Sequence, residues 1–201
     1  MNVAALTNPI DEKEQIRLSL EQELDQHYGP VEFVCEGGTR YIFRSKWGVG
    51  ENKTQSRFIK VDKSEVSGPR SQRHVGRGYD TSHDMSILSD IDHPNIVQLV
   101  DTCNLNKHGN ASIELEFQDA KTLDEIVSRS GALSVSEFED VFTGILEAER
   151  YLVNEKGIYH RDAKPANILV RKTASNKLQA KLTDLANAAK KEDLEKKVLP
   201  T

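Results

Sequence analysis

The sequence predicts an α+β fold in which two lobes flank a cleft. Predicted strands dominate residues 31–117, whereas predicted helices dominate residues 118–201. A run of strands followed by a run of helices is typical of α+β folds. A chain of 201 residues suits one domain built of two small lobes. Residues 1–30 are expected to form an N-terminal extension that contains one helix.

That extension contains an apolar pattern of helical period. Ile16, Leu20 and Leu24 recur at the spacing of one helical face, which predicts a helix over residues 11–28.

The strand-rich lobe is predicted from short apolar runs separated by turn residues. A Gly-Gly turn, Gly37 and Gly38, interrupts the first of these runs, and residues 64–78 are expected to form a loop because they are rich in Ser, Gly and Arg. A helix is expected over residues 79–91. The predicted strands lie within residues 30–47 (two strands), 55–63, 96–105 and 111–119.

The second lobe is predicted to be mainly helical. Its longest helix covers residues 134–157 and carries six apolar residues that we expect on one buried face. These six are Phe138, Val141, Phe142, Ile145, Leu146 and Leu152. The other expected elements are helices over 122–130 and 190–197 and strands over 167–172 and 179–186.

Composition excludes several classes of function. Lys and Arg total 27 against 32 Asp and Glu, so the net charge of -5 gives no electrostatic support for nucleic-acid binding. No apolar run approaches the ~18 residues of a membrane span. The start shows no basic region followed by an apolar one, so no Sec-type signal is expected, although a secretion address of another kind stays open. We expect a soluble, monomeric protein.

One short stretch, YHRDAKPANILV at residues 159–170, concentrates polar side chains before an apolar run. His160, Arg161, Asp162, Lys164 and Asn167 stand at the spacing H-R-D-x-K-x-x-N. With each residue type near ~5% of usage, five such fixed positions arise by chance in fewer than roughly one chain in 10⁴. The set therefore predicts a site that carries chemistry and is not explained by five unrelated structural roles.

At these residues the sequence resembles the eukaryotic-type protein kinases of the Ser/Thr class. "TDLA" places Asp184 where that family has its D-F-G aspartate, and "FIKV" places Lys60 where it has the V-A-I-K lysine. "IELEFQDAKTLDEIV" resembles the hinge between the lobes, with Leu115, Glu116 and Phe117 beside the nucleotide. The resemblance covers residues 31–190 and implies a bilobal kinase fold, with a β-rich N-lobe at 31–117 and a reduced, mainly helical C-lobe at 118–201.

The resemblance also implies ATP and Mg²⁺ as cofactors and a role for each catalytic residue. Asp162 would act as the catalytic base, and Lys164 would steady the γ-phosphate. Lys60 would bind the α- and β-phosphates, while Asn167 and Asp184 would hold Mg²⁺ through their oxygens.

Three further positions complete the implied nucleotide site. Asp84 stands where the family has a glutamate that pairs with the lysine, here Lys60. Gly37 and Gly38 stand in the glycine-rich loop, where only Gly37 keeps a family glycine position and Arg40 replaces another. The resemblance gives His160 an architectural role beneath the Asp184 segment.

The expected substrate platform is missing from the sequence. Only 17 residues follow Asp184, with no A-P-E motif and no long activation loop. Either the chain is truncated or it is a kinase reduced to its ATP-handling core, and we expect the second. Such reduced kinases resemble bacterial effectors of the OspG-like and HopBF-like types, which a type III system secretes into the host cytoplasm. This resemblance implies a protein substrate in the host, such as a chaperone.

Two other functions stay open. A pseudokinase or docking module would explain the altered glycine-rich loop, Asp84, and Phe58 in place of a small residue two positions before Lys60. A kinase of small molecules would explain the missing peptide platform, although the spelling HRDAKPAN favours a protein kinase.

Overall fold

The structure, a computed structural model, describes residues 11–24, 28–37, 40–48, 54–63, 81–105 and 108–198. It confirms the α+β class, with a β-sheet in the N-terminal half and most helices in the C-terminal half. Gly38 and the expected loop at residues 64–78 lie outside the described residues.

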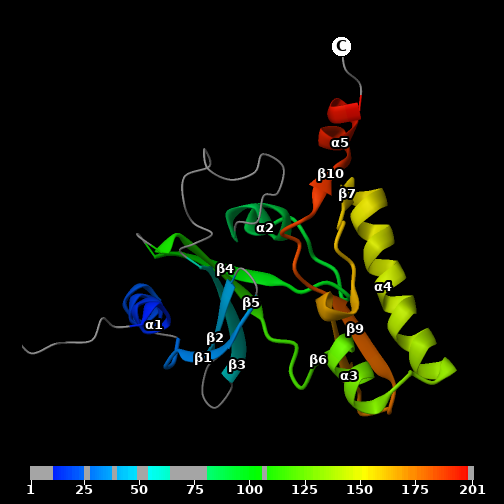
Figure 1. Cartoon of the computed structure of the whole chain (residues 1–201), viewed down its shortest axis with the longest axis horizontal. Coiled ribbons are helices and arrows are strands. Elements are labelled where there is room, and N and C mark those ends of the chain that lie inside the picture. Colours follow the sequence, from blue (N-terminus) through cyan, green and yellow to red (C-terminus); the bar gives the residue numbers. More distant parts are fainter. Residues whose placement is uncertain are drawn as a thin grey trace, which may run out of the picture.

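The N-terminal lobe is built on an antiparallel sheet of five strands in the order β1-β2-β3-β5-β4 (Figure 1). Side chains alternate between the two faces of a strand, so cross-strand pairs identify the face of each residue. Lys60 pairs with Ile42 and Ser112, whereas Ile59 pairs with Phe43 and Ile113 on the opposite face. The strands are β1 (Glu32–Glu36), β2 (Arg40–Gly48), β3 (Thr54–Asp62), β4 (Leu99–Asn104) and β5 (Asn110–Leu115).

Helix α1 (Glu12–Glu23) covers the face of the sheet that carries Ile59. Its Ile16 and Leu20 are fully buried against Phe43 and neighbouring apolar residues of that face. Figure 1 shows α1 beside the sheet and far from the long helix of the other lobe. The face that carries Lys60 is therefore the one directed toward the second lobe.

Helix α2 (Thr81–Leu88) joins the sheet to the second lobe. It contacts β3, β4 and β5, yet its buried Ile87 and Leu88 belong to the same apolar cluster as the core of the C-terminal lobe. The segment after α2 forms a parallel bridge between Ile96 and Leu182.

The C-terminal lobe combines helices with two small sheets, one in the order β6-β8-β9 and one formed by β10 and β7. Thr122 and Ser134 each close a capping box, in which a side-chain oxygen and a glutamate satisfy backbone N–H groups at the helix start. The elements are β6 (Lys121–Thr122), α3 (Leu123–Ser130), α4 (Val135–Glu155), β7 (Ile158–Tyr159), the short helix η3 (Pro165–Asn167), β8 (Ile168–Lys172), β9 (Leu178–Leu182), β10 (Ala189–Lys190) and α5 (Lys191–Val198).

The buried face of α4 differs from the predicted one. Phe138 and Leu146 are 50% and 66% exposed, so both predictions of burial are wrong. Phe138 stacks on Phe142 along a neighbouring stripe, with ring centroids 4.2 Å apart. The helix has two adjacent apolar stripes. The stripe that contains the small residues Gly144 and Ala148 is the buried one, and it lets α4 approach β9 closely. The buried residues of α4 are Val141, Gly144, Ile145, Ala148 and Leu152.

Among the described residues, none of the helices combines the length and the apolar character that crossing a membrane requires.

Candidate active site

Asp162 lies in the loop between β7 and η3 and accepts three hydrogen bonds on one carboxylate oxygen. Its Oδ2 is 2.7 Å from Lys164 Nζ, 3.0 Å from Asn167 Nδ2 and 3.3 Å from Asn187 Nδ2. Partial burial raises the pKa of Asp162, but these three donors outweigh it and the net shift is downward. The carboxylate is therefore ionised at neutral pH, and Oδ1 has no donor among the described residues.

His160 fixes this loop to the segment before Asp184. Its ring is buried, and Nδ1 accepts a hydrogen bond from the backbone N–H of Asp162 at 3.3 Å. Nε2 must then carry the proton, which it donates to the carbonyl oxygen of Thr183 at 3.2 Å. A second link runs from the Thr183 N–H to the Asn167 carbonyl oxygen, at 3.1 Å. The architectural role expected of His160 agrees with these contacts.

Two residues of the site have a backbone conformation that side chains disfavour. Arg161 has φ 66° and Asp184 has φ 64°, both in the left-handed region. Such conformations cost about 1–3 kcal/mol each and collect at functional sites. One of these residues precedes Asp162 and the other is Asp184, so both conformations occur beside the two carboxylates of the site.

Asn167 and Asp184 have oxygens that could hold Mg²⁺. Asn167 Nδ2 donates to the carbonyl oxygen of Asp162 at 2.9 Å as well as to its carboxylate, which leaves the amide oxygen for another partner. The Asp184 side chain is 41% exposed. Within the described ranges no group of three or more His, Cys, Asp or Glu could hold a metal ion. One amide and one carboxylate supply only part of the shell of Mg²⁺, and in nucleotide sites phosphate oxygens and waters usually supply the rest.

Lys60 and Asp84 are each occupied by another partner. Lys60 Nζ lies 2.8 Å from Glu114 Oε1 and donates to Thr183 Oγ1 at 3.2 Å. Asp84, fully buried on α2, instead accepts from Arg40 Nη1 at 2.7 Å and from the backbone N–H of Leu185 at 3.1 Å. The structure thus differs from the expected Lys60–Asp84 pair.

The sheet register explains the partner of Lys60. Lys60 pairs with Ser112 and Phe58 with Glu114, so Lys60 and Glu114 occupy one face in diagonal positions. Burial raises the pKa of Glu114, and the positive charge of Lys60 opposes that rise without cancelling it.

Arg40, at the start of β2, contacts three carboxylates. In addition to Asp84, its Nε lies 3.2 Å from Asp62 Oδ1 and its Nη1 lies 3.4 Å from Asp184 Oδ1. Burial lowers the pKa of Arg40, but the three carboxylates outweigh burial and the net direction is upward. Arg40 therefore stays charged and ties β2, β3 and α2 to the Asp184 segment.

The hinge residues lie at the end of β5 and directly after it, and their environments differ. Leu115 pairs with Arg57, on the sheet face opposite Lys60, so its side chain is directed away from the cleft. The Glu116 N–H donates to the Ser56 carbonyl oxygen at 3.0 Å.

Phe117 anchors the hinge to the C-terminal lobe. Its ring is buried beneath the Arg171 guanidinium, whose central carbon lies 4.5 Å from the ring centroid. Lys181 Nζ lies 5.6 Å from the same centroid. In the N-terminal lobe, the Gly37 N–H donates to the Arg40 carbonyl oxygen at 2.8 Å.

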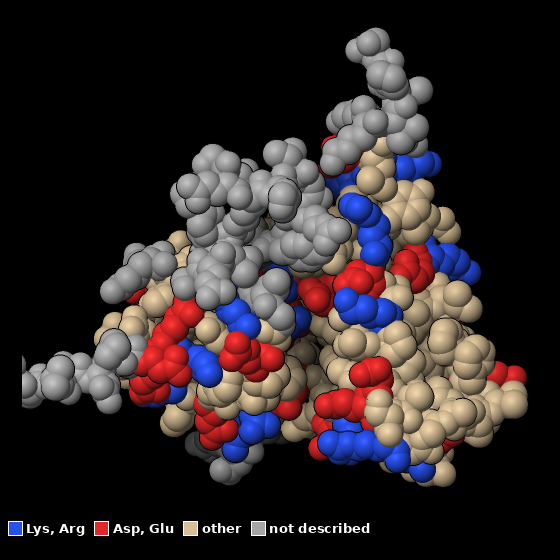
Figure 2. Space-filling model, in the orientation of Figure 1, with Lys and Arg blue, Asp and Glu red and all other residues tan. Residues whose placement is uncertain are grey.

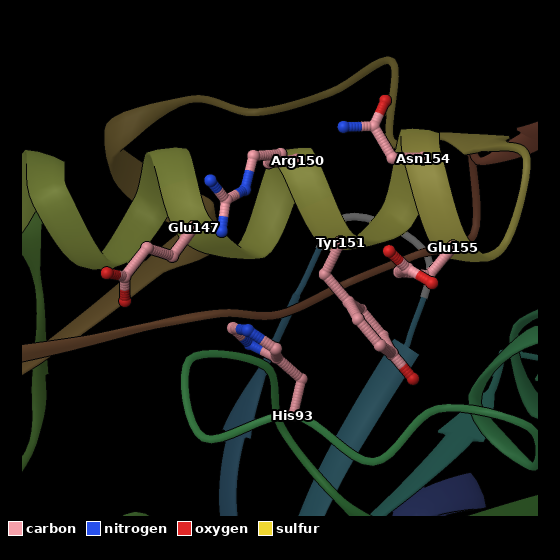
Figure 3. Close-up of a pocket in the computed structure, with 6 residues that line it drawn as sticks. All are labelled: His93, Glu147, Arg150, Tyr151, Asn154 and Glu155. Atoms are coloured by element: carbon pink, nitrogen blue, oxygen red, sulfur yellow. The ribbon is translucent and has the colours of Figure 1, made fainter.

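Charged side chains of both signs border the hollow between the two lobes in the face that Figure 2 shows. A separate cavity of about 390 Å³ lies between α4 and the turn after α2 (Figure 3). His93 stacks there on Tyr151, with ring centroids 4.8 Å apart. None of the predicted site residues lines this cavity, so it is distinct from the candidate active site.

Comparison with models of known protein families identifies the family of this chain. The protein kinase domain model matches residues 51–199. The chain belongs to the protein kinase family. Kinases of this family use ATP and Mg²⁺ in general.

Individual kinases resemble the chain over much of its length. It is 30% identical over 175 residues to a probable serine/threonine-protein kinase, fhkD, of Dictyostelium discoideum, a match that covers 83% of this chain and 23% of that protein. Calcium/calmodulin-dependent protein kinase type 1 of Macrobrachium nipponense is 29% identical over 134 residues, which cover 65% of this chain and 38% of that kinase. The chain thus spans less than two fifths of the length of these curated relatives.

The kinase family pattern does not indicate three of the residues that the structure brings into the site. Glu114 and Thr183 contact Lys60, and Asn187 contacts Asp162. The alternation along β5 could have placed Glu114 on the face of Lys60. Asn187 carried no signal, because its approach depends on how the chain turns after Asp184.

Proposed function

We propose that this chain is a Mg-ATP-dependent protein kinase that transfers the γ-phosphate to Ser or Thr hydroxyls of a protein substrate. The observation that carries the proposal is the geometry of Asp162, whose Oδ2 accepts from Lys164, Asn167 and Asn187 while Oδ1 has no donor among the described residues. An ionised, oriented carboxylate with one open oxygen suits a group that positions a hydroxyl and takes its proton.

The residues divide the reaction among them. The substrate hydroxyl oxygen would bond to the γ-phosphorus as the bond between that phosphorus and the β–γ bridging oxygen of ATP breaks; ADP would leave with that oxygen, and the hydroxyl proton would pass to Asp162. Lys164, 2.7 Å from Asp162, would neutralise charge on the γ-phosphate. Lys60 would contact the α- and β-phosphates. Mg²⁺, held by Asn167 and Asp184, would supply positive charge beside the phosphates.

The test is transfer of labelled phosphate from ATP to protein acceptors, including the chain itself. We expect Asp162→Asn to lower the rate of transfer by about 100-fold or more, because general-base groups contribute roughly 10²–10⁴-fold. Asp184→Asn should have a comparable effect. Asp124→Asn, the same chemical change at an exposed position of α3, is the matched control and should transfer normally.

A docking module without phosphoryl transfer is a second candidate, favoured by one observation. Lys60 is held by Glu114, and Asp84 by Arg40, so the pair typical of an active kinase is not formed. ATP binding that ignores Mg²⁺, together with no transfer to any acceptor, would support this candidate and contradict the kinase.

We further propose that the kinase acts on a host protein, such as a chaperone, as a secreted bacterial effector. This finer proposal rests on the resemblance of the sequence to effector kinases. Incubation of the chain with a purified chaperone and labelled ATP tests it, and phosphorylation of the chaperone that Asp162→Asn abolishes is the supporting result.

A further inference from the structure

Among the residues that the structure describes, one donor group of Arg40 has no partner. The residue is 6% exposed, and its Nη2 is buried with no hydrogen bond. Its other two nitrogens are engaged by Asp62, Asp84 and Asp184. A buried polar group without a partner is costly and rare, so it indicates a ligand or a functional constraint.

The position of Arg40 identifies the side of the molecule on which that donor lies. Arg40 precedes Ile42 by two residues on β2, and Ile42 pairs with Lys60, so Arg40 and Lys60 share the sheet face directed toward the second lobe. Nη1 of Arg40 is 3.4 Å from Asp184 Oδ1. Nη2 is bonded to the same guanidinium carbon as Nη1, and it therefore lies near the carboxylate that the proposed function assigns to Mg²⁺.

We propose that Arg40 is a phosphate-binding residue of the nucleotide site, with Nη2 donating to a phosphate oxygen of ATP while Nη1 remains on Asp84 and Asp184. The proposal rests on the proposed function, because it requires a nucleotide in this cleft. A guanidinium presents several donors in one plane, so it can hold a carboxylate on one side and a phosphate on another.

The proposal explains how the chain binds phosphate with an altered glycine-rich loop. In the usual loop, glycines let backbone N–H groups approach the phosphates. Here Arg40 occupies one of those glycine positions, and a side-chain donor takes the place of backbone donors. The Lys60 ammonium group has three N–H donors, and Glu114 at 2.8 Å and Thr183 at 3.2 Å already engage two of them, so Arg40 adds a donor for phosphate.

Binding of ATP, ADP and adenosine to Arg40→Lys tests the proposal by calorimetry. Lysine keeps a positive charge for Asp84 but cannot also reach a phosphate with a second planar donor. We expect ATP and ADP to bind about 10- to 100-fold more weakly, the loss typical of one charge-assisted hydrogen bond, with adenosine affinity unchanged. Arg44→Met, on the same strand face but 44% exposed, is the matched control and should bind all three as the wild type does.

A second variant separates a loss of nucleotide binding from a loss of folding. Arg40→Met alone leaves Asp84 as an uncompensated buried charge, so Arg40→Met is combined with Asp84→Asn, and folding is checked by circular dichroism. We expect this pair to fold and to keep the selective loss of ATP and ADP affinity.

Three results would overturn the proposal, and they separate it from the proposed function. Equal losses for ATP and adenosine would make Arg40 structural only, and unchanged ATP affinity would remove it from the site. Either result leaves the kinase proposal intact if the wild type transfers phosphate. A wild type that binds no ATP would overturn both proposals.

Discussion

Lys60 and Arg40, two cations of the N-terminal lobe, each pair with a different buried carboxylate. Lys60 lies against Glu114 on the neighbouring strand, and Arg40 lies against Asp84 on α2. An arginine suits the fully buried Asp84, because its fork can serve several carboxylates at once. Contacts of Asp84 with Arg40 and with the Leu185 N–H therefore help to connect α2 to the Asp184 segment, and Lys60 takes no part in them.

Glu114 makes the stability of the protein depend on pH. Its pKa is raised above its ordinary value of 4.5 in the folded state, chiefly by burial. Above pH 4.5 the folded state keeps a proton that the unfolded state releases, so the free energy of unfolding falls as pH rises from 4.5 through the raised pKa. Below 4.5 both states hold the proton, and the group adds no pH dependence.

Glu114→Gln removes this titration, and we expect its pH profile to be flatter. The free energy of unfolding of the wild type should fall relative to that of the variant as pH rises, by at most about 1.4 kcal/mol per pH unit. Urea unfolding at a series of pH values between about 4 and 8 measures the difference. A difference that stays constant over this range would contradict the raised pKa.

The grouping of polar side chains from His160 to Asn167 could be predicted from the sequence, but the partners of Lys60 and Arg40 could not. His160 to Asn167 are nearly consecutive, so a local pattern defines the spacing of these side chains. The contact between Lys60 and Glu114 depends instead on the register of the two strands and on Arg40, which pairs with Asp84 in place of Lys60. These contacts join residues that are far apart in the sequence, so no local pattern predicts them.

Helix α4 illustrates the same limit at the scale of an element. Its existence and its ends follow from the sequence, since Ser134 caps its start and Gly157, with φ 62°, follows its end. Its buried face was predicted only in part, because two apolar stripes lie side by side on the helix. The close contact with β9, and not hydrophobicity alone, decides that Leu152 is buried and Leu146 is exposed.

Two leucines of α4 give a matched test of that orientation. Leu152 is fully buried, so Leu152→Ala should lower the free energy of unfolding by about 2–5 kcal/mol through lost burial and a cavity. Leu146 is 66% exposed, and Leu146→Ala should change the free energy of unfolding by less than about 0.5 kcal/mol. Urea unfolding of both variants measures the contrast. Equal losses would mean that the helix is rotated from the orientation described here.

At the scale of the whole molecule, two apolar cores are joined across the lobes. One core lies between α1 and the sheet, and the other includes α2 together with the C-terminal lobe. Between the lobes, the Val97 N–H donates to the Leu182 carbonyl oxygen at 2.9 Å, and the Leu182 N–H donates to the Asn95 carbonyl oxygen at 2.8 Å. Because α2 packs on both lobes, neither core is independent of the other.

We therefore expect the two lobes to unfold in a single cooperative transition. Trp47, the only tryptophan of the chain, lies on β2 against Tyr28 and reports on the N-terminal lobe by fluorescence. Circular dichroism of helices reports mainly on the C-terminal lobe, which contains the 21-residue α4. The urea midpoints from the two signals should coincide, as two-state unfolding requires. Trp47→Phe confirms the origin of the fluorescence signal, and midpoints that differ reproducibly would show that the junction through α2 and Leu182 does not couple the lobes.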